Sequence, residues 1–421
     1  MAVVDPTNIF CKSTEIFPNV EICCNSSPPT QSQRVKIKNL CFVDVKPVIY
    51  PVSWGRIFTM PRPICATVHM GSLRHNLERM RHAAQGRTLW AVVKANAYGH
   101  GLLRAARAFA DADGLAMIDL CDAQAVREAG WTKRILLLEG FFDETDLPLL
   151  EKYDIETLVH NRHMIELLKA HAPYKSMKVH IKLNSGMNRL GFLPVEERMV
   201  KDELMAIPGV EVMGIVTHFA NAEPSYLSEN PSSVAKQLAR MGRLAQVEEN
   251  LCMANSAALL FRSEVGGEAV RAGVALYGAS PDSKISSKEL DIRPAMTLSA
   301  KILAIQDVPK GEAIGYGSRF ITQRPSRIAV VACGYADGYP RATPDGAPTY
   351  VEGKIAPIVG AVSMDMLTID VTDVPEAKLG SNVELWGKNI SINEIATYCH
   401  TIGYELMCAL ALRVPVVEDE N

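Results

Sequence analysis

The sequence predicts a (β/α)8 barrel followed by a mostly β domain, and two observations support this prediction. Short apolar runs alternate with helical or turn-rich segments from about residue 66 to residue 295, a rhythm typical of parallel strands. The rhythm changes near Ala295, after which Gly, Pro and Asp turns separate the apolar runs. The length of 421 residues also exceeds that of one ordinary domain.

Eight apolar runs are expected to form the barrel strands. They are Leu89–Lys94, Leu115–Ile118, Ile135–Leu138, Thr157–His160, Val179–Leu183, Val212–Thr217, Leu251–Ala254 and Ala269–Ala275. Helices are expected over 73–80, 102–109, Asp122–Ala129, Arg162–His171, Glu196–Ala206 and Val234–Asn250. A doubly wound open sheet would compete with the barrel, but no G-x-G-x-x-G motif follows the first strand.

The C-terminal region is predicted to be a second domain whose core is separate from that of the barrel. Its expected strands are Thr297–Val308, Arg327–Cys333, Lys354–Val359, Leu367–Val371 and Asn382–Trp386, and one helix is expected at Ile392–Tyr398. We therefore expect the barrel to cover residues 60–295 and the β domain to cover residues 296–421.

Composition and charge exclude several classes of protein. Hydrophobic residues make up 48%, charged residues 22%, and the net charge is −3, which is normal for a soluble globular protein and argues against a nucleic-acid partner. No apolar run approaches the ~18 residues needed to span a membrane. The ten cysteines form no C-x-x-C pair, so they indicate neither a metal site nor a disulfide framework. A reducing cytoplasm fits this pattern best.

Lys94 is the most informative residue, because it ends the apolar run Leu89–Lys94 and precedes a glycine-flanked turn. Lysine is rarely buried unless it is paired. A lysine at the end of a buried strand is partly desolvated, which lowers its pKa and provides a nucleophilic amine for Schiff-base chemistry. An isolated lysine would more often extend into solvent, but its neighbours here favour the chemical interpretation.

Other polar residues follow the ends of later strands, on the face where (β/α)8 enzymes place their catalytic groups. They are Lys182, Arg189, His218, Asn255, Ser256 and Arg271. We expect them to form one site with Lys94. A phosphate needs backbone N–H groups and hydroxyls at a glycine turn or a helix start. The residues placed to supply them are Tyr98, Ser256, Gly273 and Val274.

The run Val92–Gly101, with sequence VVKANAYGHG, resembles residue for residue the pyridoxal-phosphate lysine segment of bacterial alanine racemases. The similarity extends from about Met60 to about Val417. The resemblance implies a pyridoxal-phosphate enzyme that interconverts L-alanine and D-alanine and supplies D-alanine for peptidoglycan. It also implies that a first strand, at about 63–70, joins the β domain, and that the active unit is a head-to-tail homodimer.

The resemblance further implies how the cofactor is held. Lys94 would carry it, with His218, Asn255 and the phosphate residues named above as contacts. Arg271 matches the partner of the pyridine nitrogen, where most pyridoxal-phosphate enzymes use a carboxylate. Arginine stays protonated and cannot accept a hydrogen bond, so the nitrogen should remain unprotonated and transamination should be disfavoured. Arg189 would contact the phenolic oxygen and the substrate carboxylate.

Racemisation needs an acid/base on each face of the substrate Cα. By resemblance, Lys94 serves one face and Tyr316, in the run Ile314–Gly317, serves the other from the partner subunit. A tyrosine ordinarily titrates near pH 10, so cationic neighbours are needed to adapt it to this task. Met364 would offer its backbone N–H to the substrate carboxylate. Lys182 matches a lysine that is carbamylated in many members of the family.

Residues 1–59 differ in composition from the rest and have no counterpart in the resemblance. They contain four cysteines and a Ser/Pro/Gln-rich stretch from Ser26, without the basic start and apolar core of a signal peptide. We expect either a disordered extension or a misassigned start, with Met60 as the true initiator. A transit peptide is the alternative, because acidic residues are sparse and serines frequent, although arginine is also sparse.

Two departures from the family pattern, Leu412 in place of a common tyrosine and Asn184 in place of a common aspartate, touch neither expected base. Three other interpretations stay open. A broad-specificity or serine racemase would need only small pocket changes. A pyridoxal-phosphate amino-acid decarboxylase of the same fold should have a carboxylate at position 271. A non-enzymatic cofactor carrier should lack the β domain and Tyr316.

Overall fold

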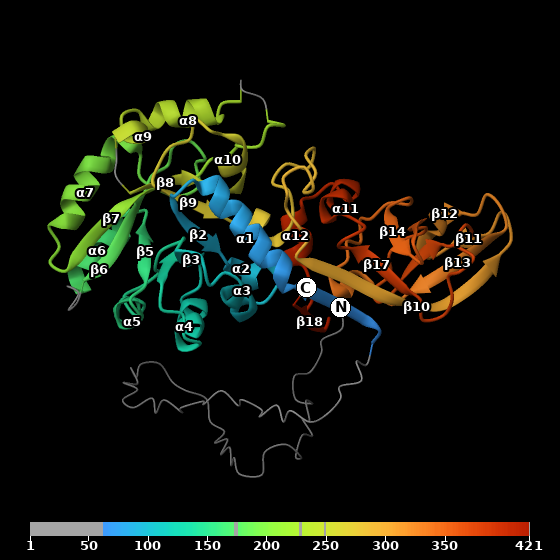
Figure 1. Cartoon of the computed structure of the whole chain (residues 1–421). Helices are drawn as coiled ribbons and strands as arrows, with labels where there is room; N and C mark the ends of the chain where they lie inside the picture. Colours follow the sequence, from blue (N-terminus) through green and yellow to red (C-terminus); the bar gives the residue numbers. More distant parts are fainter. Residues whose placement is uncertain (1–61, 172–175, 227–229, 248–249, 421) are drawn as a thin grey trace, which may run out of the picture. The chain divides into compact units, whose positions relative to one another are not determined.

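The computed structural model describes residues 62–171, 176–226, 230–247 and 250–420, and its central feature is a closed barrel of parallel strands in sequence order. The strands are β2 (Thr88–Val92), β3 (Gly114–Met117), β4 (Arg134–Leu137), β5 (Glu156–Val159), β6 (Met177–Lys182), β7 (Val210–Val216), β8 (Leu251–Ala254) and β9 (Ala269–Ala272). Pairing of β9 with β2 closes the ring, which confirms the predicted barrel (Figure 1). The expectations for residues 1–59 lie outside the described residues.

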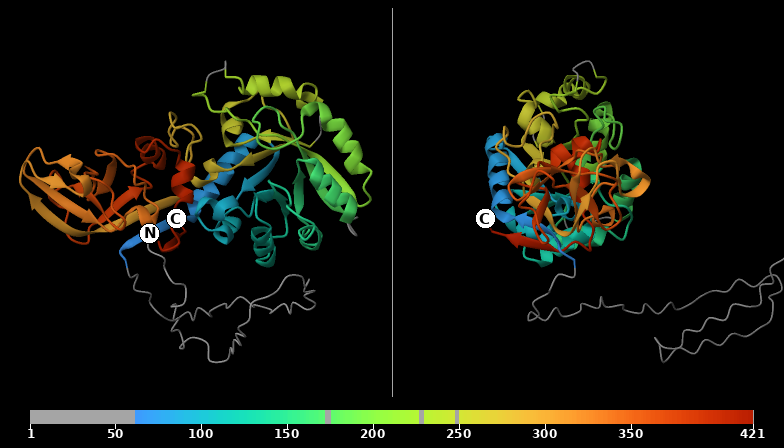
Figure 2. Two further views of the ribbon diagram at one scale, coloured as in Figure 1. Left: turned by 180° about the vertical axis from the view of Figure 1, so that it is seen from behind. Right: turned by 90° about the vertical axis from the view of Figure 1, so that its right-hand side faces the viewer.

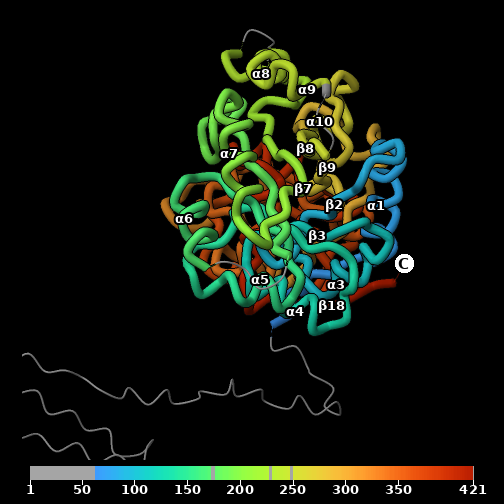
Figure 3. Tube along the Cα trace, turned by 90° about the vertical axis from the view of Figure 1, so that its left-hand side faces the viewer, coloured from blue at the N-terminus to red at the C-terminus, as the bar shows by residue number. Residues whose placement is uncertain are grey.

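Helices cover the outside of the barrel (Figure 3). They are α1 (Met70–Ala84), α3 (Leu102–Ala108), α4 (Leu120–Glu128), α5 (Leu147–Tyr153), α6 (Arg162–His171), α7 (Glu197–Met205), α8 (Val234–Met241), α9 (Leu244–Val247) and α10 (Ser256–Phe261), with the 3-10 turns η1 (Pro194–Glu196) and η2 (Val274–Tyr277). Buried residues of α1 recur every three or four positions, as at Leu73, Leu77 and Met80. No helix in the described ranges is long and apolar enough to cross a membrane.

Glycines account for two differences from the predicted elements. The helix expected over Val234–Asn250 ends at Met241, because Gly242 has a φ of 56° and a non-helical ψ, and α9 follows as a separate short helix. The strand expected over Ala269–Ala275 ends at Ala272, where Gly273 turns the chain into η2. Alternating apolar runs locate an element, but backbone conformation at glycine sets where it ends.

The C-terminal part of the chain forms an eight-stranded sheet, which confirms the mostly β prediction. Its elements are β10 (Met296–Val308), β13 (Ser326–Val331), β14 (Pro348–Val351), β15 (Lys354–Pro357), β16 (Leu367–Asp370), β17 (Asn382–Trp386) and β18 (Val416–Asp419), with β1 (Ile64–His69) from the start of the described chain. A small hairpin, β11 (Ala313–Ile314) and β12 (Phe320–Ile321), stands apart; the turns η3 (Tyr316–Ser318) and η4 (Tyr335–Asp337) and the helices α11 (Ile392–Tyr398) and α12 (Gly403–Cys408) complete the region.

The expectation of a separate core for the C-terminal region is wrong. One continuous cluster of buried hydrophobic residues runs from the barrel into the sheet. The reason is the connection between the two: β1 pairs with β10 and β18 in the sheet and passes at His69 directly into α1 of the barrel (Figures 1 and 2). Because no linker separates these elements, their apolar faces merge.

A buried ionic cluster closes the N-terminal end of the barrel, opposite the expected site. Arg134 and Glu156, the first residues of β4 and β5, form a bidentate pair, with Arg134 Nη2 donating to Glu156 Oε2 over 2.7 Å. His180 Nε2 lies 2.7 Å from the same Glu156 oxygen. Burial alone would raise the pKa of Glu156, but hydrogen bonds from Arg134 and His180 outweigh it and lower this pKa from 4.5 to about 2.

We predict that Glu156→Gln lowers the free energy of unfolding by about 2 kcal/mol at pH 7, because it takes the carboxylate away from the buried His180 and from the partly exposed Arg134. Since the folded-state pKa lies below the unfolded value, the stabilisation is complete above about pH 4.5 and is lost as the pH falls toward about 2. Urea denaturation across this range should therefore show the two proteins converging in acid. Glu166→Gln, which removes an exposed pair with Lys169, should cost less than about 0.5 kcal/mol at every pH. Equal losses for both variants would contradict the assignment.

Candidate active site

The predicted strand-end residues converge at the C-terminal end of the barrel. Lys94, Lys182, His218, Arg189 and Arg271 are close enough to influence one another's electrostatics. Among the described residues, the acidic groups acting on Lys94 are the carboxyl group of Glu139, after β4, and the thiol of Cys408. The barrel end therefore collects basic groups with little compensating negative charge, an arrangement suited to an anionic ligand.

The loop that carries Lys94 has an unusual backbone. β2 ends at Val92, so Lys94 lies two residues beyond the strand rather than at its end as predicted. Ala95, Asn96 and Ala97 all have φ near +54°, a left-handed conformation that costs roughly 1–2 kcal/mol for each non-glycine residue. Such strain persists only where the surroundings impose it, and it is concentrated at functional sites.

Contacts from three directions hold this loop. Asn96 Oδ1 accepts a hydrogen bond from the N–H of Leu102 over 2.9 Å. His100 Nδ1 lies 2.9 Å from the carbonyl oxygen of Tyr98. Position 99 requires glycine, because a Cβ there would collide with the carbonyl oxygen of Met407 on α12. The helix near the C-terminus thus braces the strained loop.

Arg271 is buried, and its two terminal nitrogens donate to Thr217, just after β7, and to Cys252, in β8. Its Nη1 donates to the carbonyl oxygen of Cys252 over 2.8 Å, and its Nη2 donates to that of Thr217 over 2.7 Å. Nη2 also lies 3.2 Å from Nδ1 of His218. Because a guanidinium only donates, His218 Nδ1 accepts, which places the proton of the neutral imidazole on Nε2. Burial and the charge of Arg271 hold the pKa of His218 well below 6.5, in agreement with a neutral ring.

The two lysines of the site are both shifted toward the neutral amine. Burial, followed by the charges of Arg271 and Arg189, lowers the pKa of Lys182 from 10.5 to about 7. Burial and Arg189 also lower the pKa of Lys94, and Glu139 opposes this shift. A lowered pKa increases the fraction of neutral amine, and the neutral amine is the form that acts as a nucleophile and a base.

Tyr98, Ser256 and Gly273 meet on the β9 side of the site. Ser256 Oγ accepts a hydrogen bond from the N–H of Gly273 over 2.8 Å. A Cβ at Gly273 would lie 2.8 Å from the hydroxyl oxygen of Tyr98, so only glycine leaves room there. The Tyr98 ring stacks on Tyr277 with centroids 4.6 Å apart.

Val274 and Asn255 lie at the starts of the neighbouring helical turns. Val274 is the first residue of η2, and Asn255 caps α10 by accepting a hydrogen bond from the N–H of Ala258.

Arg189 stands on an exposed loop after β6. Asn184 folds this loop: its Oδ1 accepts from the N–H groups of Gly186 and Asn188 over 3.0 and 2.9 Å. The amide of Asn184 therefore serves the local turn, and its carboxylate counterpart in the family could accept the same two bonds. Asn184 shapes the loop and also lines a small cavity together with Lys182, Arg189 and His218.

The structure does not bring Tyr316 and Met364 to Lys94 within one chain. Tyr316 begins η3, directly after β11, and β11 lies on the side of the sheet away from barrel strand β2 (Figure 1). Their side chains are 71% and 53% exposed, and in the described ranges neither has a hydrogen bond or ion pair with the Lys94 group. Leu412 is fully exposed. These side chains are available to another molecule.

The Met364 loop is held rigidly in this exposed position. Asp337, which is fully buried, accepts hydrogen bonds from Arg62 Nη1 and Arg413 Nε, each over 2.8 Å. Arg413 also reaches Asp365, the neighbour of Met364, over 2.6 Å. The two ends of the described chain thereby fix the loop.

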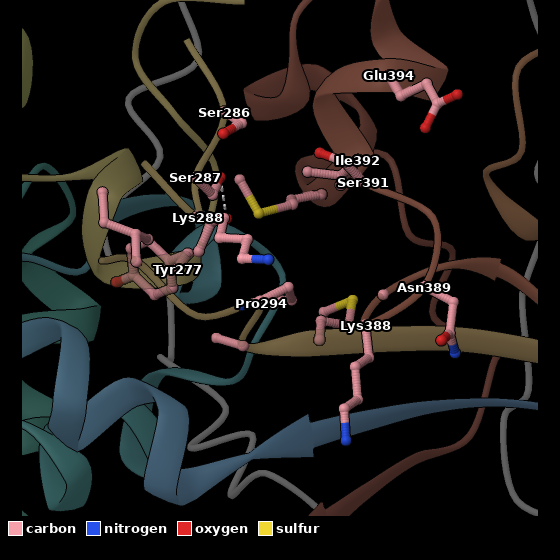
Figure 4. A pocket seen from close by; sticks show the side chains of 16 residues that line it. Tyr277, Ser286, Ser287, Lys288, Pro294, Lys388, Asn389, Ser391, Ile392 and Glu394 are labelled. Carbon is pink, nitrogen blue, oxygen red and sulfur yellow. Dashed lines mark hydrogen bonds between the residues drawn. The ribbon is translucent and has the colours of Figure 1, made fainter. Parts of the chain in front are cut away.

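Several residues of the site were not predicted from the sequence. Glu139 follows a strand end and could have been found by the same rule as Lys182. Thr217 and Gln237 contribute buried hydrogen bonds that no local sequence pattern predicts. A cavity of about 240 Å³ also went unanticipated; it lies behind Tyr277, with the Lys288 amine pointing into it and Lys388 pointing away (Figure 4).

Comparisons with known proteins agree with this geometry. The family models described as the N-terminal and C-terminal domains of alanine racemase match residues 68–281 and 295–418. An alanine racemase of Burkholderia mallei is 46% identical over 360 residues, covering 85% of this chain and 99% of the relative. A catabolic alanine racemase of Klebsiella aerogenes is 46% identical over 363 residues, with the same coverage. The crystal structure of the biosynthetic alanine racemase from Pseudomonas aeruginosa superposes with a TM-score of 0.81 at 40% identity, covering 85% of this chain and 99% of that one.

Proposed function

Because the chain belongs to the alanine racemase family, we propose that it interconverts L-alanine and D-alanine with pyridoxal 5'-phosphate and two bases, Lys94 and Tyr316. The observation that carries this proposal is the collection of basic groups around the Lys94 amine, whose pKa is lowered by burial and by Arg189. We propose that the product D-alanine serves peptidoglycan synthesis. The six described cysteines are free thiols, which supports a cytoplasmic location.

The residues present fit pyridoxal phosphate. Its phosphate, phenolate and the substrate carboxylate are all anionic, and the site offers mostly cations and donors. Lys94 Nζ would bind its aldehyde carbon. Ser256, Gly273, Val274 and Tyr98 would hold the phosphate, with His218 and Asn255 as further contacts and Arg189 on the phenolic oxygen and the substrate carboxylate. When bound, the cofactor withdraws electrons from the substrate Cα and makes its proton acidic.

Arg271 fits the pyridine nitrogen because of its remaining donor. Of the five N–H groups of a guanidinium, the four on Nη1 and Nη2 are directed at Cys252, Thr217 and His218. Within the described chain, the Nε–H has no acceptor. It would donate to a pyridine nitrogen that carries no proton, and this polarity argues against a decarboxylase with a carboxylate at the same position.

In this proposal the two bases act on opposite faces of the substrate Cα. Lys94, whose pKa is lowered by burial and by Arg189, takes or returns the proton on one face, and the Tyr316 hydroxyl does so on the other. Met364 binds the substrate carboxylate through its backbone N–H. Since Tyr316 and Met364 are exposed and have no hydrogen bond or ion pair with Lys94 in the described ranges, we propose that they complete the site of a partner in a head-to-tail homodimer.

Lys182 is proposed to be carbamylated. Its amine, with a pKa of about 7, is neutral often enough to add to carbon dioxide, releasing a proton and leaving a carbamate anion. A negative charge there would pair with Arg189 and Arg271, the two cations that now destabilise the protonated lysine.

We predict that the purified protein racemises L-alanine with a higher kcat/KM than L-serine or L-lysine. A fitted small pocket discriminates against one extra methylene by about 10- to 200-fold. Steady-state rates with the three amino acids, with product amines measured in parallel, test this. Faster turnover of serine would favour the broad-specificity interpretation, and release of carbon dioxide would establish a decarboxylase.

We predict that pyridoxal phosphate is bonded to Lys94. Borohydride should abolish the visible absorption of the protein and leave a reduced adduct on the peptide that contains Lys94. Lys182, a second buried lysine at the same barrel end, is the internal control and should carry no adduct. Recovery of the adduct on any peptide lacking Lys94 would refute the assignment.

We predict that an inactive Tyr316→Phe variant and an inactive Lys94→Ala variant restore activity when mixed. Loss of one positioned acid/base typically costs about 10²–10⁴-fold. In a hybrid dimer both lesions fall in one site, so the other site is intact. Racemase activity should rise as subunits exchange, with exchange followed by mass spectrometry. If hybrids form and activity does not return, the partner does not supply Tyr316.

A further inference from the structure

Gln237, on α8, is a buried amide outside the residues assigned above. Its side chain is fully buried, and each of its polar atoms is hydrogen-bonded. Its Oε1 accepts from the N–H of Ala220 over 2.8 Å, and its Nε2 donates to Ser185 Oγ over 2.8 Å and to the carbonyl oxygen of His218 over 3.0 Å. We propose that Gln237 is the positioning residue that holds His218 and the acceptor of Arg271 in place. This inference rests on the proposed function.

The hydrogen bonds from Gln237 continue in one direction across two strand ends. Thr217 Oγ1 donates to the carbonyl oxygen of Leu183 over 2.9 Å, so it accepts from Ser185 Oγ, 2.8 Å away. Ser185 in turn accepts from Gln237. The amide donor at one end and the carbonyl acceptor at the other fix every proton in this chain. Ser185 and Thr217 are also buried, so no solvent exchanges with these bonds.

This chain joins the segments on which the site residues stand. Leu183 follows Lys182 at the end of β6, and Thr217 presents to Arg271 the carbonyl oxygen that accepts from Nη2. Gln237 binds both sides of the turn after β7, at His218 and Ala220. A shift of this turn would therefore move the His218 ring and the Arg271 acceptor together.

The same helix also holds the loop that carries Arg189. Ser232, just before α8, donates from Oγ to the carbonyl oxygen of Gly186 over 2.9 Å. Arg240, one turn after Gln237, donates from Nη1 to the carbonyl oxygen of Ser185 over 3.4 Å. Helix α8 and Ser232 before it thus contact the loops after β6 and β7 through polar groups. Of the side chains that make these contacts, that of Gln237 is fully buried.

An apolar residue at position 237 would fill the same space but would break the network. The Ala220 N–H and the Ser185 hydroxyl would lose partners in a buried setting, at a cost of about 1–3 kcal/mol for each unsatisfied group. These groups would recover hydrogen bonds at the lowest free-energy cost if the turn after β7 moved toward water. We therefore expect the effect of a substitution to appear at the site rather than only in stability.

The test compares Gln237→Met, which keeps the side-chain length, with Asn393→Leu. Asn393, which is partly buried, is the control, because its amide likewise makes two 3.0 Å hydrogen bonds to backbone groups and these tie α11 to Ser280 rather than to His218. Gln237→Met should lower kcat/KM by about 10- to 100-fold, as loss of an outer partner of a site residue commonly does. Asn393→Leu should change kcat/KM less than twofold at a similar loss in melting temperature.

A second measurement needs no catalysis. Hydrogen exchange of the full chain, followed by mass spectrometry, should accelerate in peptides covering 183–191 and 217–222 in Gln237→Met, and should be unchanged there in Asn393→Leu. Unchanged exchange in these peptides would overturn the proposal even if the protein proved to catalyse another reaction. Accelerated exchange in a protein without racemase activity would instead place the failure in the proposed function.

Ser185→Ala keeps the proposal falsifiable if Gln237→Met folds poorly. The two residues belong to one chain of hydrogen bonds, so their effects on kcat/KM should be markedly less than additive when combined. Gln237→Met combined with Asn393→Leu should be additive. Additivity in the first pair, or kcat/KM of Gln237→Met within twofold of the unmodified protein, would show that Gln237 only packs α8.

Discussion

The buried charge of Arg271 is the constraint on which the site depends. A guanidinium without a carboxylate partner is costly to bury, and here main-chain carbonyl groups at the ends of β7 and β8 offset that cost. The charge then acts on its neighbours: together with burial it lowers the pKa of His218 and of Lys182, and it contributes to the lowered pKa of Lys94. The barrel thus fixes one cation, and that cation sets the protonation of the groups around it.

A second constraint joins the barrel to the C-terminal region. The left-handed turn after Lys94 is held by the close approach of Met407 to Gly99 and by the stacking of Tyr98 on Tyr277. Met407 belongs to α12, more than three hundred positions along the chain. The strained loop is therefore stabilised by contacts with the C-terminal region, which shares one continuous core with the barrel.

The sequence predicted the barrel because its strands are apolar on both faces, and the strand-end rule then located Lys94, Lys182, His218 and Arg271. It missed interactions between residues that are distant in sequence. Gln237 and Ser185 lie 52 positions apart, and neither has a neighbour pattern that marks it as buried. The seven-residue helix α5 was also not predicted, because its two buried residues, Leu147 and Leu150, are too few to establish a period.

The distribution of charge relates the two proposed bases to each other. A cluster of cations disfavours the protonated amine and favours the ionised phenol, so it moves an amine and a phenol toward neutral pH from opposite sides. Within one chain the cluster lowers the pKa of Lys94, whereas the Tyr316 side chain is exposed on the C-terminal sheet region. If a partner's Tyr316 phenol docked beside the cations at the barrel end, the positive charge there would also act on that phenol. Assembly would then complete the geometry of the site and match the proton affinities of its two bases in a single step.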